Sequence, residues 1–266
     1  MQPRFLIIGA MKAGTTTLYE DLAAVSGLYL PPEKEPDDLA YAQADTPEGV
    51  ARYMAKFAAA PANAICGEAS TTYAKRPTYE GVADRAVRLL GPSLKIIYMQ
   101  RDPIKRMISQ YHHLQGLGQE TRSLNEAVTQ DETYVAYSSY DWQLAPWRAV
   151  LPETQILIVR FEDYIANRPV IFAQICTFLG VAPDQRPEET HRNASAGKAV
   201  VKPGSLMAKI ANSHFYLYRI KPLISTRTRD KIKALILPKT AALTQTLSDD
   251  ARAYLTTKLA EKKADQ

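Results

Sequence analysis

The sequence predicts an α/β fold, a P-loop-like three-layer domain with a mainly parallel central sheet flanked by helices. Short apolar runs typical of buried strands alternate with longer stretches of helical spacing. The first apolar run ends in a loop of small residues that leads into a helix, and the chain shows no internal repeat. Because parallel neighbours need crossover connections, this alternation implies βαβ units with helices on both faces of the sheet.

The N-terminal residues contain the first strand, loop and helix of this pattern. The apolar run FLII leads into GAMKAGTTT, and Leu18, Leu22 and Val25 then have the i, i+4, i+7 spacing of a helix face. A loop rich in proline and acidic residues, LYLPPEKEPDD, follows. Pro47 suits the first position of the next helix, through EGVARYMAKF.

The remaining elements continue the alternation. Further strands are predicted for AICGEA (64–69), LKIIYMQ (94–100) and QILIVRFED (155–163). Further helices are predicted at 79–91, 103–114, 123–130, 140–151, 168–180 and 249–263. Ser123 with Glu126 has the capping-box spacing, and Gly91 and Gly180 suit helix ends. We expect a single domain over 1–266, with a basic, helical C-terminal segment from about residue 204.

The composition is that of an ordinary folded protein. With 266 residues, of which 46% are hydrophobic and 23% charged, the chain can bury a sizeable core. Cys66 and Cys176 lie in apolar runs and are predicted to be buried, reduced thiols. No run approaches the ~20 apolar residues of a membrane span, and the N-terminal apolar patch is too short for a secretory leader. We therefore expect a cytoplasmic location.

Positive charge is concentrated late in the chain. The net charge is +5, and between residues 200 and 239 nine lysines and arginines face a single acidic residue, Asp230. Solvated helix faces with apolar stems explain such a pattern. The alternative is contact with an acidic acceptor or with a membrane surface.

The loop after the first strand has the features of a phosphate site. Gly9 and Gly14 have the separation of the two glycines in the Walker loop, but Thr15 stands where the Walker lysine belongs and Lys12 lies inside the loop. Backbone N–H groups, the helix dipole and three consecutive threonine hydroxyls from Thr15 could still cradle a phosphate. An ordinary glycine-containing βα turn is the alternative. The absence of an apolar strand ending in a Walker-B aspartate argues against an NTPase.

A second anion site is predicted after the strand LKIIYMQ. Arg101 follows this strand, and Ser109 lies about two helical turns further on. Arginine offers a planar fork of donors that suits phosphate. A helix capped by Asp102, with Arg101 merely on the surface, is the alternative. Together with the first loop, however, this segment would provide the two phosphate sites that a nucleotide with 5′ and 3′ phosphates needs.

With these two motifs, the sequence resembles the sulfotransferase family that uses 3′-phosphoadenosine-5′-phosphosulfate (PAPS). The resemblance covers roughly residues 4–181 and is closer to carbohydrate (heparan-type) and bacterial members than to phenol or steroid members. It implies a 5′-phosphosulfate site at Lys12, Ala13, Gly14, Thr15, Thr16 and Thr17 and a 3′-phosphate site at Arg101 and Ser109. It also implies a late loop over the nucleotide at Arg192, Asn193 and Lys198. No metal is expected.

The resemblance further implies an in-line sulfuryl transfer in which Lys12 neutralises the leaving phosphate oxygen and a general base takes the acceptor's proton. PEKEPDDL is similar to the family's Lys-Glu-x-x-Phe-Phe loop and makes Glu35 the first candidate for the base, although two non-aromatic residues stand where two aromatics are usual. His113, His112 and Glu68 are the other candidates. The expected acceptor is a saccharide or glycolipid, with a small phenolic or lipid alcohol as the alternative.

Two other functional classes stay open at this point. A P-loop kinase or NTPase would require ATP and Mg²⁺ and is disfavoured by the misplaced lysine. A non-catalytic binder of nucleotides or nucleic acid would fit the basic C-terminal segment but would show salt-dependent polymer binding without turnover. We expect no nucleic-acid partner.

Overall fold

The structure, a computed structural model, describes residues 1–183 and 245–264. Within them, residues 1–106, 135–183 and 258–264 belong to one compact unit, and 107–134 with 245–257 belong to a second. The expectation of a single domain over the whole chain stays a prediction. The basic segment 200–239 lies outside the described residues.

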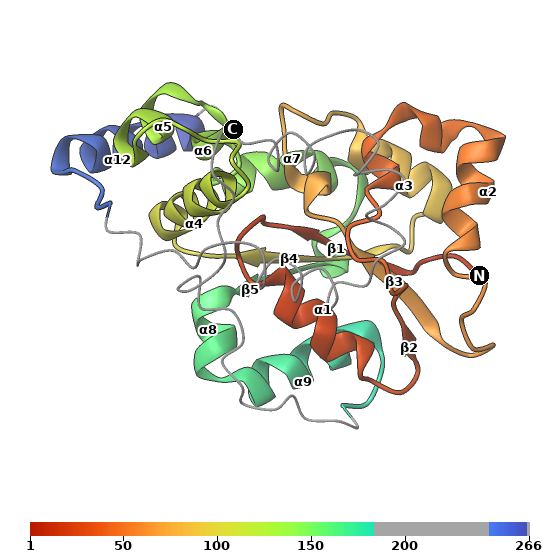
Figure 1. Cartoon of the computed structure of the whole chain (residues 1–266). Helices are drawn as coiled ribbons and strands as arrows, with labels where there is room; N and C mark the ends of the chain where they lie inside the picture. Colours follow the sequence, from red (N-terminus) through yellow and green to blue (C-terminus); the bar gives the residue numbers. More distant parts are fainter. Residues whose placement is uncertain (184–244, 265–266) are drawn as a thin grey trace, which may run out of the picture. The chain divides into compact units, whose positions relative to one another are not determined.

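The first unit contains a sheet of five parallel strands in the order β2-β3-β1-β4-β5 (Figure 1). The strands are β1 (Phe5–Gly9), β2 (Leu28–Tyr29), β3 (Ile65–Ala69), β4 (Lys95–Gln100) and β5 (Ile156–Arg160). All five residues of β1 are buried, and Phe5 pairs with Gly67 of β3 on one side and Lys95 of β4 on the other. The loop that follows β1 therefore lies between the carboxyl ends of two neighbouring strands, where α/β proteins bind ligands.

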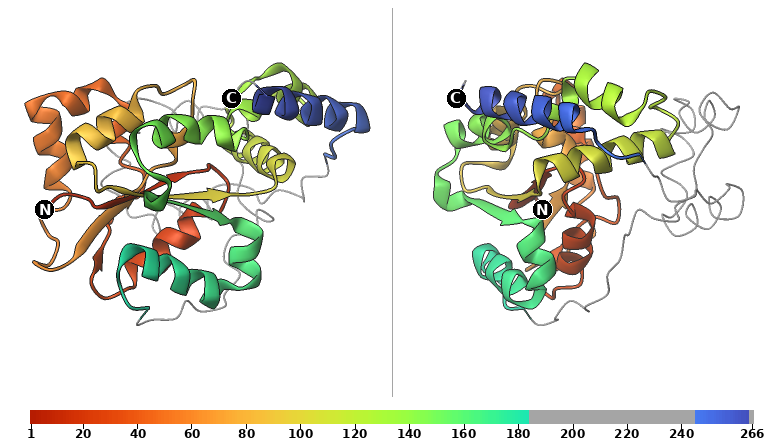
Figure 2. Two further views of the ribbon diagram at one scale, coloured as in Figure 1. Left: turned by 180° about the vertical axis from the view of Figure 1, so that it is seen from behind. Right: turned by 90° about the vertical axis from the view of Figure 1, so that its left-hand side faces the viewer.

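Helices cover both faces of this sheet. In Figure 1, α1, α8 and α9 lie on one side and α3 and α7 on the other, and Figure 2 shows the same arrangement from behind. The α-helices of the first unit are α1 (Thr15–Ala23), α2 (Pro47–Ala55), α3 (Val82–Leu90), α7 (Tyr140–Val150), α8 (Phe161–Ala166) and α9 (Arg168–Leu179). Short 3₁₀ turns are η1 (Asp38–Ala40), η2 (Ala42–Asp45), η3 (Thr71–Ala74) and η4 (Glu153–Gln155). The predicted fold class is confirmed, and Cys66 and Cys176 are buried free thiols as predicted.

One predicted strand needs correction, and one short strand was not predicted. The segment QILIVRFED was predicted to be one strand, but β5 ends at Arg160 and α8 begins at Phe161, with Glu162 and Asp163 in its first turn. Acidic side chains are favourable there because the helix N-terminus carries partial positive charge. The two-residue strand β2 was not predicted, because so short an element has no periodicity to detect.

Pro146 is tolerated inside α7 because another residue replaces its missing donor. A proline in a helix has no N–H to donate to the carbonyl four residues earlier. In α7 the carbonyl that loses its donor is that of Trp142. The Arg76 Nη1 donates to this oxygen at 3.1 Å, and the Arg76 guanidinium also lies 4.4 Å from the centroid of the Trp142 ring. The helix therefore continues through the proline, as predicted.

The second unit is built from helical segments. Two helices, α4 (Pro103–Gly116) and α12 (Asp249–Ala264), run across the unit boundary, as does the short α6 (Thr133–Ala136), while α5 (Leu124–Gln130) lies wholly inside the second unit. The predicted capping box of α5 is present. The residues that follow the undescribed stretch bond to α5, since Gln245 Oε1 accepts from Leu124 N at 2.7 Å. No helix among residues 1–183 and 245–264 is long and apolar enough to cross a membrane.

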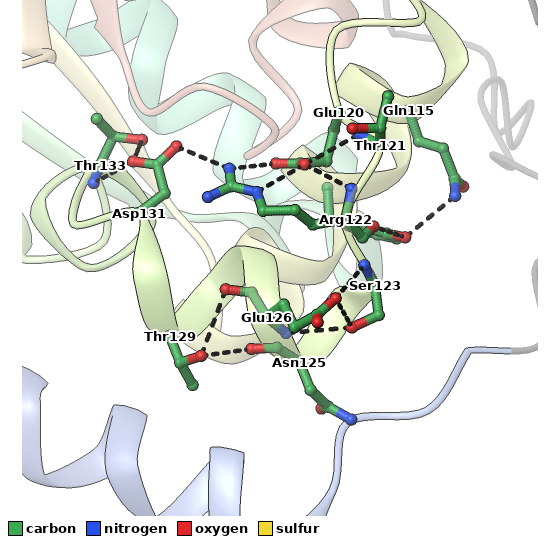
Figure 3. Close-up of polar contacts among 11 residues, drawn as sticks. Gln115, Glu120, Thr121, Arg122, Ser123, Asn125, Glu126, Thr129, Asp131 and Thr133 are labelled. Atoms are coloured by element: carbon green, nitrogen blue, oxygen red, sulfur yellow. Dashed lines mark hydrogen bonds and ion pairs between the residues drawn. The ribbon is translucent and has the colours of Figure 1, made fainter. Parts of the chain in front are cut away.

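A polar cluster fixes the connection from α4 to α5. Figure 3 shows the Arg122 guanidinium between Glu120, at 2.7 Å, and Asp131, at 3.7 Å. The buried Glu120 carboxylate also accepts from the backbone N–H groups of Thr121 and Arg122. The Arg122 hydrogen bond holds the pKa of Glu120 below its usual range, so this turn keeps its charge pair at neutral pH.

We predict that Asp21→Ala lowers the free energy of unfolding by about 3 kcal/mol, because it breaks a buried ion pair. The Asp21 carboxylate of α1 accepts from Arg168 Nη2 at 2.5 Å and Nε at 3.0 Å and from the Tyr164 hydroxyl, which ties α1 to α8 and α9. Urea denaturation measures the loss. The control is Glu20→Ala, an exposed neighbour on the same helix, which should change stability by no more than about 0.5 kcal/mol. Equal effects of the two variants would contradict the assignment.

Candidate active site

The loop between β1 and α1 has a constrained backbone. Ala10 N donates to the Met99 carbonyl of β4 at 2.7 Å, and Ala13 N donates back to Ala10 O at 3.1 Å. Lys12 and Gly14 both have left-handed φ angles, 67° and 89°. A Cβ on Gly14 would lie 2.5 Å from the Phe161 ring, so the position requires glycine. Helix α1 starts directly after it and leaves its first N–H groups for a ligand.

Arg101 lies against this loop. Its Nη1 donates to Lys12 O at 3.2 Å, and its guanidinium is 5.0 Å from the centroid of the Phe161 ring. The Tyr140 hydroxyl fixes the Arg101 backbone by donating to its carbonyl at 2.6 Å. The Arg101 Nε is buried and has no hydrogen-bond partner among the described residues. Because an unpaired buried donor is costly, this nitrogen indicates a missing acceptor, which fits the predicted anion site.

Sequence reasoning missed a second arginine at the loop, Arg106. Its side chain is fully buried, its Nη1 donates to Met11 O at 3.4 Å, and its Nε donates to Ser138 Oγ at 2.5 Å. Arg101 and Arg106 therefore hold two consecutive carbonyls of the phosphate loop. In the sequence Arg106 is one of several cations near the start of α4, and only its burial distinguishes it.

The predicted base, Glu35, lies on a loop fastened to the end of β3. Glu35 N donates to Ala69 O at 2.9 Å, and Glu35 has a left-handed φ of 60°. Its carboxylate forms an ion pair with Lys34 at 2.5 Å, and its side chain is 41% exposed. The two residues that replace the usual aromatics, Asp38 and Leu39, are both buried.

A second carboxylate on this loop, Asp37, was not among the predicted site residues. Its N–H donates to Ser70 Oγ at 3.1 Å, and its Oδ1 accepts from the Thr72 hydroxyl. Burial raises the pKa of Asp37, and the charge of Glu35 raises it further, while Lys75 and Lys34 oppose the shift. Its position two residues after Glu35 in a proline-containing loop is the signal that could have found it.

Lys75 follows η3 and faces the same group of charges. Burial lowers the pKa of Lys75, and the carboxylates of Glu35 and Asp37 oppose this shift. The positive charges of Arg106 and Lys34 add to the lowering. The loop that carries Glu35, the end of β3 and the start of α4 thus contribute charged groups to one place in the first unit.

Glu68, the candidate base on β3, is buried. Its side chain is 1% exposed, and Oε1 accepts from Tyr53 at 2.9 Å and Tyr73 at 2.6 Å while Oε2 accepts from Ser70 at 3.3 Å. Burial raises the pKa of Glu68 to about 7, against the effect of the tyrosine hydrogen bonds. These contacts make Glu68 a residue that positions Ser70, which in turn bonds to the backbone of Asp37.

The other predicted residues lie in the second unit or outside the described residues. Ser109, His112 and His113 belong to the part of α4 in the second unit. His113 is exposed and His112 is half-buried, with a pKa lowered by burial. The candidates of the late loop, Arg192, Asn193 and Lys198, lie outside the described residues. In the phosphate loop Ala13, Thr15 and Thr17 are buried and Thr16 is exposed.

Known proteins that are similar to this chain are sulfotransferases. A family model described as the sulfotransferase family matches residues 3–185. The human bifunctional heparan sulfate N-deacetylase/N-sulfotransferase 2 is 29% identical over an alignment of 202 positions, which covers 68% of this chain and 22% of that protein. Human carbohydrate sulfotransferase 15 is 23% identical over an alignment of 323 positions, gaps included, which covers 96% of this chain and 55% of that protein. The chain thus spans about a fifth and about half of these two relatives.

A solved structure also resembles most of the chain. The crystal structure of a sulfotransferase from Alicyclobacillus acidocaldarius matches with 27% sequence identity and a TM-score of 0.63. The match covers 73% of this chain and 87% of that one.

We predict that Gly14→Ala destabilises the protein by about 2 kcal/mol more than Gly27→Ala. Both glycines have left-handed φ angles, 89° and 83°, so alanine is strained at both. Only at position 14 does the new methyl group meet another side chain, the Phe161 ring, while nothing lies within 4 Å at position 27. Denaturant unfolding measures both variants. Equal losses would show that the loop does not depend on this close approach.

We predict that the stability of the Glu68→Gln variant relative to wild type increases as pH rises from 5 to 8. The folded pKa of Glu68, about 7, is above the ordinary value of 4.5, so folded wild type holds a proton that the unfolded chain has released between these values. The wild-type free energy of unfolding therefore falls as pH rises through this range, and a glutamine cannot contribute to that fall. Urea denaturation of both proteins at pH 5, 6.5 and 8 checks this. A constant difference would contradict the raised pKa.

Proposed function

The chain belongs to the sulfotransferase family, and we propose that it transfers a sulfuryl group from PAPS to a hydroxyl or amine of an acceptor, with 3′-phosphoadenosine-5′-phosphate (PAP) as the leaving group. The observation that carries the proposal is the phosphate loop with its two arginines. Arg101 touches the loop and keeps a buried Nε without a described partner. A loop of this kind without the Walker lysine suits a phosphosulfate rather than a magnesium triphosphate.

In this proposal the loop residues provide electrostatic stabilisation. The N–H groups at the start of α1 bind the 5′-phosphate, and Lys12 neutralises charge that develops on the oxygen leaving the sulfur. Arg101 binds the 3′-phosphate through its unpaired Nε. The contributions of Ser109, Arg192, Asn193 and Lys198 stay predictions from the sequence.

The acceptor side is proposed to lie at the loop that contains Glu35. A carboxylate of this loop takes the acceptor's proton, and the family resemblance favours Glu35, with His113 as the alternative. The acceptor we propose is a saccharide or glycolipid. The names of the two human relatives support this choice, which is otherwise open to any small alcohol that reaches the loop.

We predict that PAP raises the melting temperature of the wild-type protein and that ATP with Mg²⁺ does not. At 100 times its dissociation constant, a ligand adds about 2.7 kcal/mol of stability. Lys12→Ala and Arg101→Ala should each reduce the shift that PAP produces, because each removes a cation from the loop. Differential scanning fluorimetry measures the shifts.

The matched control for this experiment is Arg4→Ala. Arg4 is exposed and precedes β1, at the end of the strand opposite the phosphate loop. The Arg4→Ala variant also removes one positive charge, but away from the phosphate loop, so it should leave the melting shift produced by PAP unchanged. Stabilisation by ATP with Mg²⁺ but not by PAP would overturn the proposed function in favour of a kinase-like enzyme.

A further inference from the structure

The loop that carries Glu35 presents two carboxylates, and their surroundings differ. Glu35 is 41% exposed and already holds the Lys34 ammonium at 2.5 Å. Asp37 is half-buried and is fixed at both its backbone and its side chain by the segment after β3. A base that must meet a proton in one geometry needs such fixed support.

The two oxygens of Asp37 have separate surroundings. Oδ1 accepts from the Thr72 hydroxyl. No described residue hydrogen-bonds to Oδ2. One oxygen is therefore held by the protein while the other can receive a proton from a ligand.

The support for Asp37 extends into the core. Ser70 Oγ accepts from the Asp37 N–H at 3.1 Å and donates to the enclosed Glu68 carboxylate at 3.3 Å. Asp37 itself has a left-handed φ of 61°. A non-glycine residue in this region costs about 1–2 kcal/mol, and such strain persists where surrounding bonds enforce it, often at functional sites.

We infer that Asp37 is the residue that accepts the proton lost by the acceptor, with Glu35 and Lys75 setting the charge around it. This inference rests on the proposed function and specifies which carboxylate of the loop is the base. As the acceptor oxygen or nitrogen bonds to sulfur, the bond from sulfur to the bridging phosphate oxygen breaks and its electron pair leaves with PAP. The acceptor's proton passes to Asp37 Oδ2 and is later released to water.

The charged groups around Asp37 act in opposite directions. Glu35 raises its pKa as a like charge, whereas Lys75 and Lys34 lower it, and the Thr72 hydrogen bond also lowers it. Burial is the largest effect and raises the pKa, which brings the base nearer to neutral pH. Removing Glu35 should consequently lower the pKa of Asp37, and removing Lys75 should raise it.

The decisive experiment compares Asp37→Asn with Glu35→Gln in sulfuryl transfer from PAPS to a heparin polysaccharide freed of its N-sulfates. We expect Asp37→Asn to lower kcat at least ~100-fold, as loss of a general base does, while the PAP melting shift stays as in wild type. Glu35→Gln should lose less than ~10-fold. Glu33→Gln, an exposed carboxylate of the same loop that pairs with Lys56 at 2.6 Å, is the control and should match wild type. A large loss in Glu35→Gln with an active Asp37→Asn overturns the inference.

A second readout does not depend on the acceptor chosen. Carboxyl ¹³C NMR should show the Asp37 pKa above the ordinary aspartate value, lowered in Glu35→Gln and raised in Lys75→Met. The acid limb of the pH–rate profile should move in the same directions, which a merely structural role would not produce. An Asp37 pKa at or below the ordinary value, or unmoved in both variants, overturns the inference even if the polysaccharide is not sulfated. Failure of PAP to bind wild type would instead defeat the proposed function, and the inference with it.

Discussion

The site depends on one constraint: two arginines that follow β4 donate hydrogen bonds to the backbone of the loop after β1. Arg101 and Arg106 donate to the carbonyls of Lys12 and Met11, and the Met99 carbonyl of β4 accepts from Ala10 N. Carbonyls occupied in this way cannot turn toward an anion, whose charge they would repel. The same bonds keep two guanidinium groups beside the loop. A single set of contacts thus shapes the phosphate loop and supplies its positive charge.

The opposite side of the site depends on β3 in the same manner. The Glu35 backbone bonds to Ala69 O, and the Asp37 backbone bonds to Ser70. Because β3 pairs directly with β1, the loop that carries Glu35 and Asp37 is bonded to the end of the strand next to the one that leads into the loop after β1. Their separation is therefore set by the sheet and not by the loops themselves. An in-line transfer needs this kind of fixed separation between the leaving group and the base.

The sequence was sufficient for the fold class, for most elements and for the strand–loop–helix arrangement of β1 and α1, since these follow from periodicity and motif spacing. It was insufficient wherever a distant residue decides the outcome. The residues next to Phe161 do not predict that a helix starts there, and the residues next to Pro146 do not predict that Arg76 replaces its missing donor. Arg106 carries no motif and is recognised only because it is fully buried against the loop. Asp37 was not predicted, because the family pattern implies a base at Glu35, two residues earlier.

Backbone strain connects these observations. Among the described residues, the non-glycine residues with left-handed φ are Lys12, Glu35 and Asp37. All three have charged side chains: Lys12 lies on the loop after β1, and Glu35 and Asp37 lie on the loop after β2 that is bonded to the end of β3. Glycine would relieve the strain at each position, by about 1–2 kcal/mol, but would remove the charge. The chain therefore keeps strained, charged residues where a stability argument alone would favour glycine, and the hydrogen bonds from β3 and from the arginines after β4 offset the strain. The local sequences of these loops do not favour their backbone conformations, which are therefore maintained by hydrogen bonds to residues of the sheet and to residues that follow its strands.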